Sequence, residues 1–229
     1  MNRKQLSQNF LIDDAIIEKI VEFSEVLPGD KVLEIGPGSG AITKRLLAAG
    51  AQVIAVEKDP FLAERLRDPR LQIYCGDILA FPIENLGTSL KVVSNIPFKI
   101  TARILDTLCA HIDQFTSIVL IVQKEVADKI KAKPKTKAFG PLALLLQFYT
   151  TYIADFPIPR ASFSPEPTVD VTAIKLRRRE SLPEIDPNRF FDLVKKAFQQ
   201  RRKMLAPLKK RPEELNLEEW ISFFNMSKA

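Results

Sequence analysis

The stretch Lys31-Val32-Leu33-Glu34-Ile35-Gly36-Pro37-Gly38-Ser39-Gly40 decides the fold. Its first half is an apolar run typical of a buried parallel strand. The glycines mark a turn in which the backbone can approach a ligand closely. The following pattern predicts a helix through Leu47, ended by Gly50. A strand, a glycine loop and a helix N-terminus in this order are typical of α/β proteins that bind nucleotide-like ligands.

Strand and helix patterns alternate on both sides of this stretch. Strands are predicted over residues 52–57, 71–75, 91–94, 115–122, 151–156 and 171–176, and helices over 13–23, 60–66, 101–108, 124–130 and 139–149. This alternation predicts an α/β fold with a doubly wound, Rossmann-like sheet. Beyond a linker over 181–187 only helical patterns occur. We therefore expect a catalytic domain over 1–180 and a short helical C-terminal appendage over 181–229.

The composition excludes several classes of protein. The 229 residues include two cysteines, Cys75 and Cys109, and one histidine, His111, with no ligand spacing among them. We therefore expect no metal site and no disulfide framework, and we interpret His111 as structural. No run of about 18 apolar residues occurs. These features predict a soluble, cytoplasmic protein that does not enter the membrane.

The net charge of +6 is unevenly distributed along the chain. Residues 1–120 carry a net charge of −2, and residues 121–229 carry +8. Segregated positive charge is expected where a protein faces a polyanion such as RNA. A solvated basic surface that keeps the protein soluble is the alternative.

The glycine loop alone leaves the cofactor open. Gly36, Gly38 and Ala41 also satisfy the dinucleotide pattern, so both a nicotinamide cofactor and S-adenosylmethionine are compatible with it. Glu57 ends the second strand, where a carboxylate accepts hydrogen bonds from ribose hydroxyls in either case.

Two further acids favour S-adenosylmethionine. Glu34 lies directly before the glycines, where it suits a cationic methionine group and would repel a pyrophosphate. Asp77 follows the third strand and is placed to accept a hydrogen bond from the adenine amine. An acid at the end of each of three strands is the pattern that a cationic, adenosine-bearing cofactor favours.

The tetrapeptide Asn95-Ile96-Pro97-Phe98 follows the predicted strand over 91–94. The Asn95 side-chain oxygen and the Ile96 carbonyl can both accept hydrogen bonds from one exocyclic amine. Pro97 restricts the backbone, and Phe98 offers a flat face on which a base can stack. An ordinary strand-to-helix loop is the alternative.

With these residues placed, the chain resembles the small-subunit (16S) ribosomal RNA adenine N6,N6-dimethyltransferases, the KsgA/RsmA or kasugamycin-sensitivity family. The segments that carry the resemblance are Gln8 to Leu11, Glu34 to Gly40, Gly76 to Leu79, Asn95 to Phe98, Gln123 to Ala127, Thr136 to Gly140, Phe163 to Asp170 and Phe198 to Lys203. It extends from Gln8 to about Lys203, most of the chain.

The resemblance implies methyl transfer from S-adenosylmethionine to two adjacent adenines in the 3′-terminal hairpin loop of that RNA. The expected partner is small-subunit rRNA in the immature 30S particle, and the expected state is a monomer. Residue by residue, the family implies cofactor contacts from Asn9, Leu11, Gly36, Glu57, Asp77 and Asn95.

The RNA contacts are expected from aromatic and basic residues. Phe98 should stack on one face of the base, and Phe163 is the candidate for the other face. Arg201, Arg202 and Lys203, with the basic loop over 131–137 and the arginines at 177–179, should contact phosphate. Solvated helix ends are the alternative for the single basic residues.

Three features depart from the family pattern. Phe98 stands where the family usually has tyrosine, Glu166 replaces a usual proline, and the tail beyond Lys203 is short.

The rivals are a large-subunit rRNA adenine methylase that confers antibiotic resistance, a non-catalytic ribosome-assembly factor on the same fold, and, more distantly, an NAD-dependent dehydrogenase.

Overall fold

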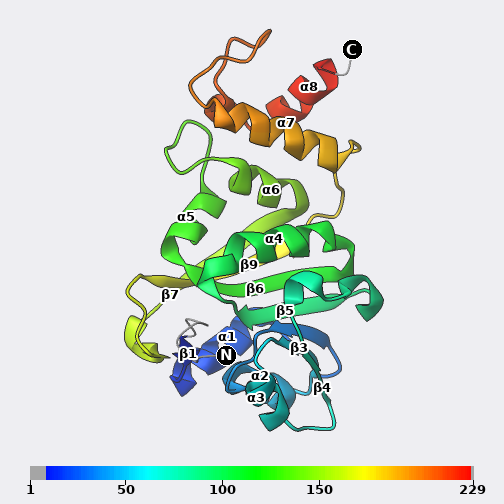
Figure 1. The fold of residues 1–229 in the computed structure, drawn as a ribbon, viewed down its shortest axis with the longest axis vertical. Coiled ribbons are helices and arrows are strands. Elements are labelled where there is room, and N and C mark those ends of the chain that lie inside the picture. The colour runs from blue at the N-terminus through cyan, green and yellow to red at the C-terminus, as the bar shows by residue number, and fades with distance from the viewer. Residues whose placement is uncertain (1–8, 228–229) are drawn as a thin grey trace. The chain divides into compact units, whose positions relative to one another are not determined.

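The computed structural model describes residues 9–227 and contains a seven-stranded sheet in the order β4-β3-β2-β5-β6-β9-β7 (Figure 1). Its strands are β2 (Lys31–Ile35), β3 (Gln52–Glu57), β4 (Leu71–Cys75), β5 (Leu90–Asn95), β6 (Phe115–Gln123), β7 (Thr150–Ile158) and β9 (Val171–Arg178). The strands from β4 to β6 pair in parallel, and β9 is antiparallel to β6. The predicted α/β fold with a largely parallel sheet is confirmed.

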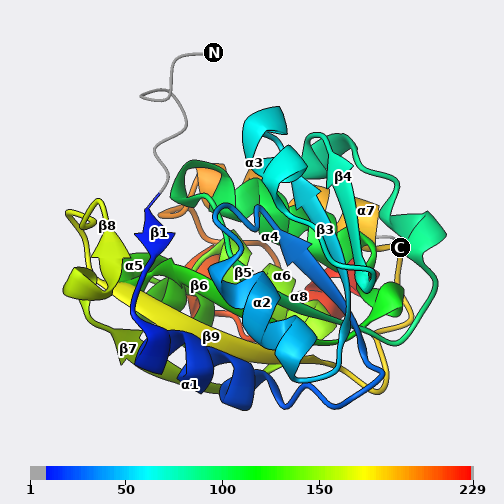
Figure 2. The same cartoon turned by 90° about the horizontal axis from the view of Figure 1, so that it is seen from below.

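Helices cover both faces of this sheet, as Figure 2 shows with α1 and α2 in front and α4 behind. These helices are α1 (Asp14–Ser24), α2 (Ala41–Ala48), α3 (Pro60–Arg65) and α4 (Thr101–Ala110). The side chain of Asp13 caps α1 by accepting hydrogen bonds from two backbone N–H groups. Ile20 of α1 and Leu46 of α2 are fully buried in one cluster with Val32 and Val119 of the sheet. This packing fixes the carboxyl ends of the central strands.

A second, two-stranded sheet was not predicted from the sequence. It joins β1 (Phe10–Leu11) to β8 (Phe163–Ser164) in antiparallel register, with Phe10 opposite Ser164 and Leu11 opposite Phe163. Strands of two residues leave no alternating pattern, and their partners lie about 150 residues apart, so no local signal marks the pair. The pairing ties the start of the described chain to the loop that follows β7.

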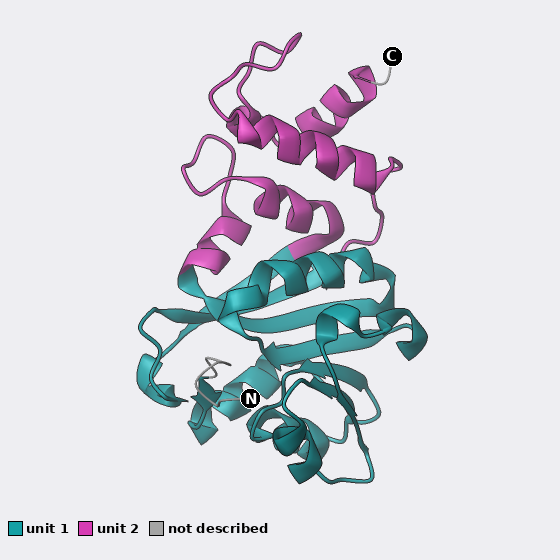
Figure 3. Cartoon of the chain, in the orientation of Figure 1, with its two compact units in different colours: residues 1–124, 152–178 teal, residues 125–151, 179–229 magenta. Residues whose placement is uncertain are grey.

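The chain divides into two compact units, residues 1–124 with 152–178 and residues 125–151 with 179–229 (Figure 3). The second unit is helical, with α5 (Lys124–Lys131) beginning at the junction, α6 (Pro141–Tyr149), α7 (Pro187–Gln199) and α8 (Leu217–Met226). Its core is aromatic. Phe148, Phe190 and Trp220 are fully buried in one cluster, and the Trp220 ring stacks on Phe198 at 5.9 Å. The predicted boundary at residue 181 stays a prediction, and the structure adds residues 125–151 to the helical unit.

Across residues 9–227, no helix has both the length and the apolar character needed to cross a membrane.

Candidate active site

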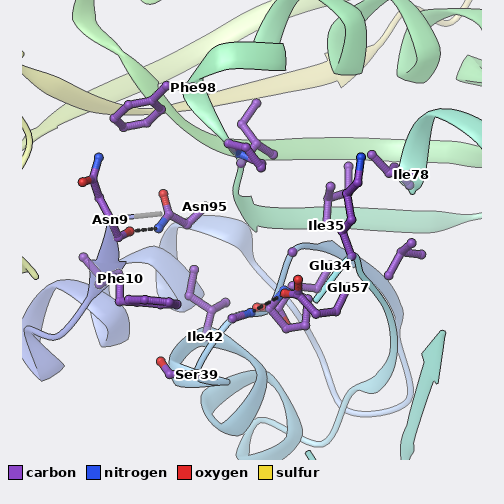
Figure 4. A pocket seen from close by; sticks show the side chains of 18 of the residues that line it. Asn9, Phe10, Glu34, Ile35, Ser39, Ile42, Glu57, Ile78, Asn95 and Phe98 are labelled. Carbon is purple, nitrogen blue, oxygen red and sulfur yellow. Dashed lines mark hydrogen bonds between the residues drawn. The ribbon is translucent and has the colours of Figure 1, made fainter. Parts of the chain in front are cut away.

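A pocket lies at the carboxyl ends of β2, β3 and β5, within the first unit (Figure 4). The residues that line it come from these strand ends, from the segment after β4 and from the segment around β1. Every residue for which we predicted a cofactor contact lines this pocket: Asn9, Leu11, Gly36, Glu57, Asp77 and Asn95. Ile96, Pro97 and Phe98 line it as well. The fold therefore brings the two predicted sites together.

The glycine loop is shaped by backbone that only glycine adopts easily. Gly36 and Gly38 have φ angles of +67° and +59°. A Cβ on Gly36 would meet no atom within 4 Å, so the space beside it is open to a ligand. A Cβ on Gly38 would lie 3.0 Å from Cε1 of Phe10. The Phe10 ring therefore packs directly on the loop, which the sequence did not indicate.

Glu57 is buried and held by two backbone donors. Its Oε2 accepts a hydrogen bond from the Gly38 N–H at 3.0 Å, and its Oε1 accepts one from the Asp59 N–H at 2.8 Å. Its side chain is only 1% exposed. Each oxygen retains a lone pair for a further donor, so the carboxylate can still accept from a diol.

Glu34 is also buried, but it lacks the negative charge that was expected to face a cationic methionine group. Its Oε2 accepts a hydrogen bond from the Thr43 hydroxyl at 2.7 Å. Burial raises the pKa of Glu34 to about 8, and the nearby Glu57 carboxylate adds to the rise. At neutral pH the side chain is therefore mostly protonated in the cofactor-free protein, and a cation would have to displace that proton to find a negative charge.

This shift predicts a pH dependence of stability. The pKa of Glu34 is about 8 in the folded protein, against 4.5 ordinarily. The unfolded chain therefore loses this proton at a lower pH than the folded protein does. The free energy of unfolding should therefore fall as pH rises from 4.5 to 8, by up to about 1.4 kcal/mol per pH unit. Urea unfolding of wild type and Glu34→Gln across this range would reveal the difference. Parallel pH curves for the two proteins would contradict the shift.

Asp77 follows β4 and caps the short 3-10 helix Ile78–Ala80 by accepting from the Leu79 N–H at 3.0 Å. Its second oxygen lies 2.8 Å from Nζ of Lys58, which also lines the pocket. The hydrogen bond from Lys58 is the main cause that holds the pKa of Asp77 below its ordinary value. Asp77 is thus an ionised acceptor, and Lys58 is a pocket residue that sequence reasoning missed.

The Asn95 side chain is oriented by the main chain of Asn9. Nδ2 of Asn95 donates to the Asn9 carbonyl oxygen at 2.9 Å, as the dashed line in Figure 4 marks. Because a carbonyl oxygen can only accept a hydrogen bond, the Asn95 atom that faces it must be the donor Nδ2. The Oδ1 atom is therefore left as the acceptor of this side chain. Asn9 was predicted to contact the cofactor, but no feature of the sequence indicated that its carbonyl would orient the Asn95 side chain.

The rest of the tetrapeptide gives the rim of the pocket its shape. Pro97 has φ −62° and ψ 119°, and it precedes a short 3-10 helix, Phe98–Ile100. Ile96 is 2% exposed, and Phe98 is half-buried at the edge of the main core. In Figure 4 the Phe98 ring lies on the same side of the pocket as Asn9 and Asn95.

Phe163 is placed differently from the expectation. The side chain is 3% exposed, pairs opposite Leu11 and packs in the core cluster. It is not among the residues that line the pocket. A stack on the second face of a base would require this ring to leave the core, so that role stays a prediction without support from the placement.

The C-terminal basic motif lies in the second unit and divides into two kinds of residue. Arg201 is bonded internally: its Nε donates to Glu213, and its Nη atoms donate to the Thr136 and Lys137 carbonyls, each at 3.2 Å. Arg202 and Lys203 are exposed. Arg201 therefore holds the basic loop over 131–137, and its predicted phosphate contact competes with three existing bonds.

A pair of substitutions separates these roles. Arg201→Ala leaves a partly buried Glu213 and two carbonyls without their donor, and should cost about 1–2 kcal/mol of unfolding free energy after allowance for solvent exposure. Arg202→Ala should change the free energy of unfolding by less than about 0.5 kcal/mol. It should also lower the slope of log affinity for RNA against log salt concentration by about 1. Urea unfolding and filter binding over a range of salt measure both. Equal destabilisation by the two changes would contradict the assignment.

Two residues that the sequence analysis singled out, His111 and Glu166, lie outside the pocket. His111 contacts the Thr107 carbonyl through Nδ1 at 2.9 Å and lies 3.4 Å from Glu84 through Nε2, which fits a structural role. Among the described residues, no group of three His, Cys, Asp or Glu is placed to hold a metal ion. Glu166, the unusual acid of the loop before β9, lies 3.6 Å from Arg160, which offsets its charge.

Comparison with known proteins points to one family. The family model described as ribosomal RNA adenine dimethylase matches residues 1–218. A protein from Protochlamydia amoebophila named ribosomal RNA small subunit methyltransferase A is 39% identical, over 97% of this chain and 90% of the relative. One of the same name from Thermosynechococcus vestitus is 38% identical, over 96% and 94%.

Solved structures agree with the fold. A dimethyladenosine transferase from Plasmodium falciparum superposes with a TM-score of 0.82 at 22% identity, over 96% of this chain and 98% of the other. The 23S rRNA methyltransferase ErmE superposes with a TM-score of 0.69 at 26% identity, over 96% and 100%. The first likeness, at this low identity, concerns the fold alone.

Proposed function

This chain belongs to the ribosomal RNA adenine dimethylase family, and on that premise we propose how its residues perform the methyl transfer. It is an S-adenosylmethionine-dependent rRNA methyltransferase. The substrate is small-subunit rRNA, as in the relatives named ribosomal RNA small subunit methyltransferase A. The proposed targets are the 6-amino groups of two adjacent adenines in its 3′-terminal hairpin loop.

The pocket residues fit the cofactor. The cofactor supplies an electrophilic methyl group. Gly36 leaves open space beside its backbone, Glu57 keeps free lone pairs for the ribose hydroxyls, and Asp77 is an ionised acceptor for the adenine amine. Asn9 and Leu11 line the same pocket. These residues would hold the cofactor.

Asn95 carries the proposed chemistry. The amine of adenine is a poor nucleophile because its lone pair is delocalised into the ring. Oδ1 of Asn95 and the Ile96 carbonyl oxygen accept its two N–H groups, which favours a tetrahedral nitrogen and stabilises positive charge as it develops. The observation that supports this role most is the hydrogen bond from Asn95 to Asn9, which leaves Oδ1 as acceptor.

Phe98 provides the surface on which the base lies. Stacking on an aromatic ring contributes about 1–3 kcal/mol per base. The target adenine must leave its own stack to reach this ring, which is easiest in a single-stranded loop. A phenyl ring retains the stacking of the family's usual tyrosine but lacks the hydroxyl.

The exposed cations of the second unit are the proposed phosphate contacts. Arg202 and Lys203 are the leading candidates, with lysines 131, 133, 135 and 137 of the loop that Arg201 holds. Binding of small-subunit RNA should weaken steeply as salt rises if several phosphates are neutralised. We further propose that the protein works as a monomer, in the cytoplasm, on the immature 30S particle.

The 26% identity with ErmE leaves one specific rival, methylation of large-subunit RNA. Incubation with labelled S-adenosylmethionine and separated ribosomal subunits tests the proposal. Label in the small-subunit RNA, found as dimethyladenine, is the expected result. Label in the large subunit would favour the rival, and no label on either would favour a non-catalytic assembly factor.

A further inference from the structure

We propose that Ser162 is a positioning residue for methyl transfer, because its hydroxyl secures the strand whose Asn9 carbonyl orients the Asn95 amide. This inference rests on the proposed function, because that function is what makes Asn95 a catalytic residue. All of the residues involved lie in the first unit.

The contact that carries the proposal joins two segments 149 residues apart. Oγ of Ser162 donates to Oδ2 of Asp13 at 2.8 Å, and the Ser162 carbonyl accepts from the Ile12 N–H at 2.9 Å. Ser162 is 2% exposed, which shields its hydroxyl and its carbonyl from water, whereas the Asp13 acceptor is partly exposed. Together they fasten the chain directly after β1 to the loop directly before β8.

The strand that these bonds fasten is short. β1 and β8 are two residues each, and a ladder of this length is weak unless other contacts support it. Asn9 immediately precedes β1, and its carbonyl is the acceptor for Asn95 Nδ2 at 2.9 Å. On the other side the Phe10 ring rests on Gly38. The position of the Asn9 carbonyl therefore depends on the ladder and on the Ser162 bonds that extend it.

Asp13 has two tasks that one substitution can separate. Oδ1 caps α1 by accepting from the Ala15 and Ile16 N–H groups at 3.1 and 3.3 Å, whereas Oδ2 accepts from Ser162. The Ser162 bond is the largest cause that lowers the pKa of Asp13, so the acceptor is ionised at neutral pH. Ser162→Ala removes the hydroxyl bond to Asp13, keeps the backbone bond to Ile12 and leaves the helix cap in place.

The expected consequence is a loss of turnover that exceeds the loss of cofactor binding. When β1 shifts, the Asn9 carbonyl no longer fixes the Asn95 amide, and Oδ1 samples other directions. Glu57 ends β3 and Asp77 follows β4, and both keep their own contacts, so only the pocket residues at β1, Asn9 and Leu11, contribute to a loss of cofactor binding. We expect kcat to fall about five- to tenfold, and cofactor affinity about twofold.

The experiment compares Ser162→Ala with Ser164→Ala and with Ser162→Thr, which keeps the hydroxyl. Ser164 lies two residues away in β8, and its exposed side chain takes no part in the backbone ladder. Turnover on small subunits, calorimetric binding of S-adenosylhomocysteine and the NMR signals of the Asn95 side-chain amide are measured, with the assignment made by Asn95→Asp.

Ser162→Ala should lower kcat and move the Asn95 amide signals to the positions of solvent-exposed amides, while Ser164→Ala and Ser162→Thr match wild type. Unchanged Asn95 signals in Ser162→Ala, or equal effects of the two alanine variants, would overturn the inference. Because the amide signals need no RNA, a wild type without methyltransferase activity would refute the proposed function and still leave this test readable.

Discussion

Asn95→Ala should lower methyl transfer to small subunits by about 10²- to 10³-fold, which is the usual effect of removing one preorganised hydrogen-bond partner of a developing charge. The alanine removes the Oδ1 acceptor and the bond to the Asn9 carbonyl. The glycine loop and Glu57 keep their contacts with each other. Cofactor affinity should therefore change by less than about tenfold, and single-turnover rates with saturating cofactor measure the effect.

Asn85→Ala is the matched control, because Asn85 is an exposed asparagine outside the pocket. It should transfer methyl groups at the wild-type rate. Turnover by Asn95→Ala that equals this control would remove Asn95 from the chemistry and leave it as part of the pocket wall.

Glu57→Gln should weaken cofactor binding by about a hundredfold. The carboxylate accepts from two backbone N–H groups, those of Gly38 and Asp59, and an amide can accept from only one of them. The amide nitrogen would then face a backbone donor, which distorts the glycine loop. Hydrogen bonds to a charged partner contribute about 1.5–3 kcal/mol, and 1.4 kcal/mol is tenfold in affinity.

Calorimetric titration with S-adenosylhomocysteine measures this loss. Glu64→Gln, the same change at an exposed position of α3, should bind as wild type does. If both variants bound equally well, the ribose contact proposed for Glu57 would be wrong.

The sheet and the composition of the pocket were predictable from sequence because each depends on local pattern. The apolar run before Gly36 and the run before Asn95 both became central parallel strands. Parallel strands end at the same edge of a sheet, so the residues that follow them meet there. This is why Gly36, Glu57, Asp77 and Asn95 could be assigned to one pocket before the fold was known.

The parts that were not predictable depend on contacts between distant segments. The β1–β8 pair buries Phe163, which sequence alone offered as a stacking partner for the second face of the base. Arg201 is held by Glu213 and by the loop over 131–137, although its motif suggested three equivalent cations. The protonation of Glu34 depends on how deeply the strand is buried, which a residue type does not encode.

The most direct test of the proposed mechanism is a crystal structure of the protein with S-adenosylhomocysteine and an RNA hairpin that carries the target adenines. We expect an adenine that is unstacked from the RNA, lies against Phe98 and places its 6-amino nitrogen within about 3.2 Å of Asn95 Oδ1. An adenine that binds elsewhere, or an amino group turned away from Asn95 with the sulfur of the cofactor product on the far side of the pocket, would contradict it.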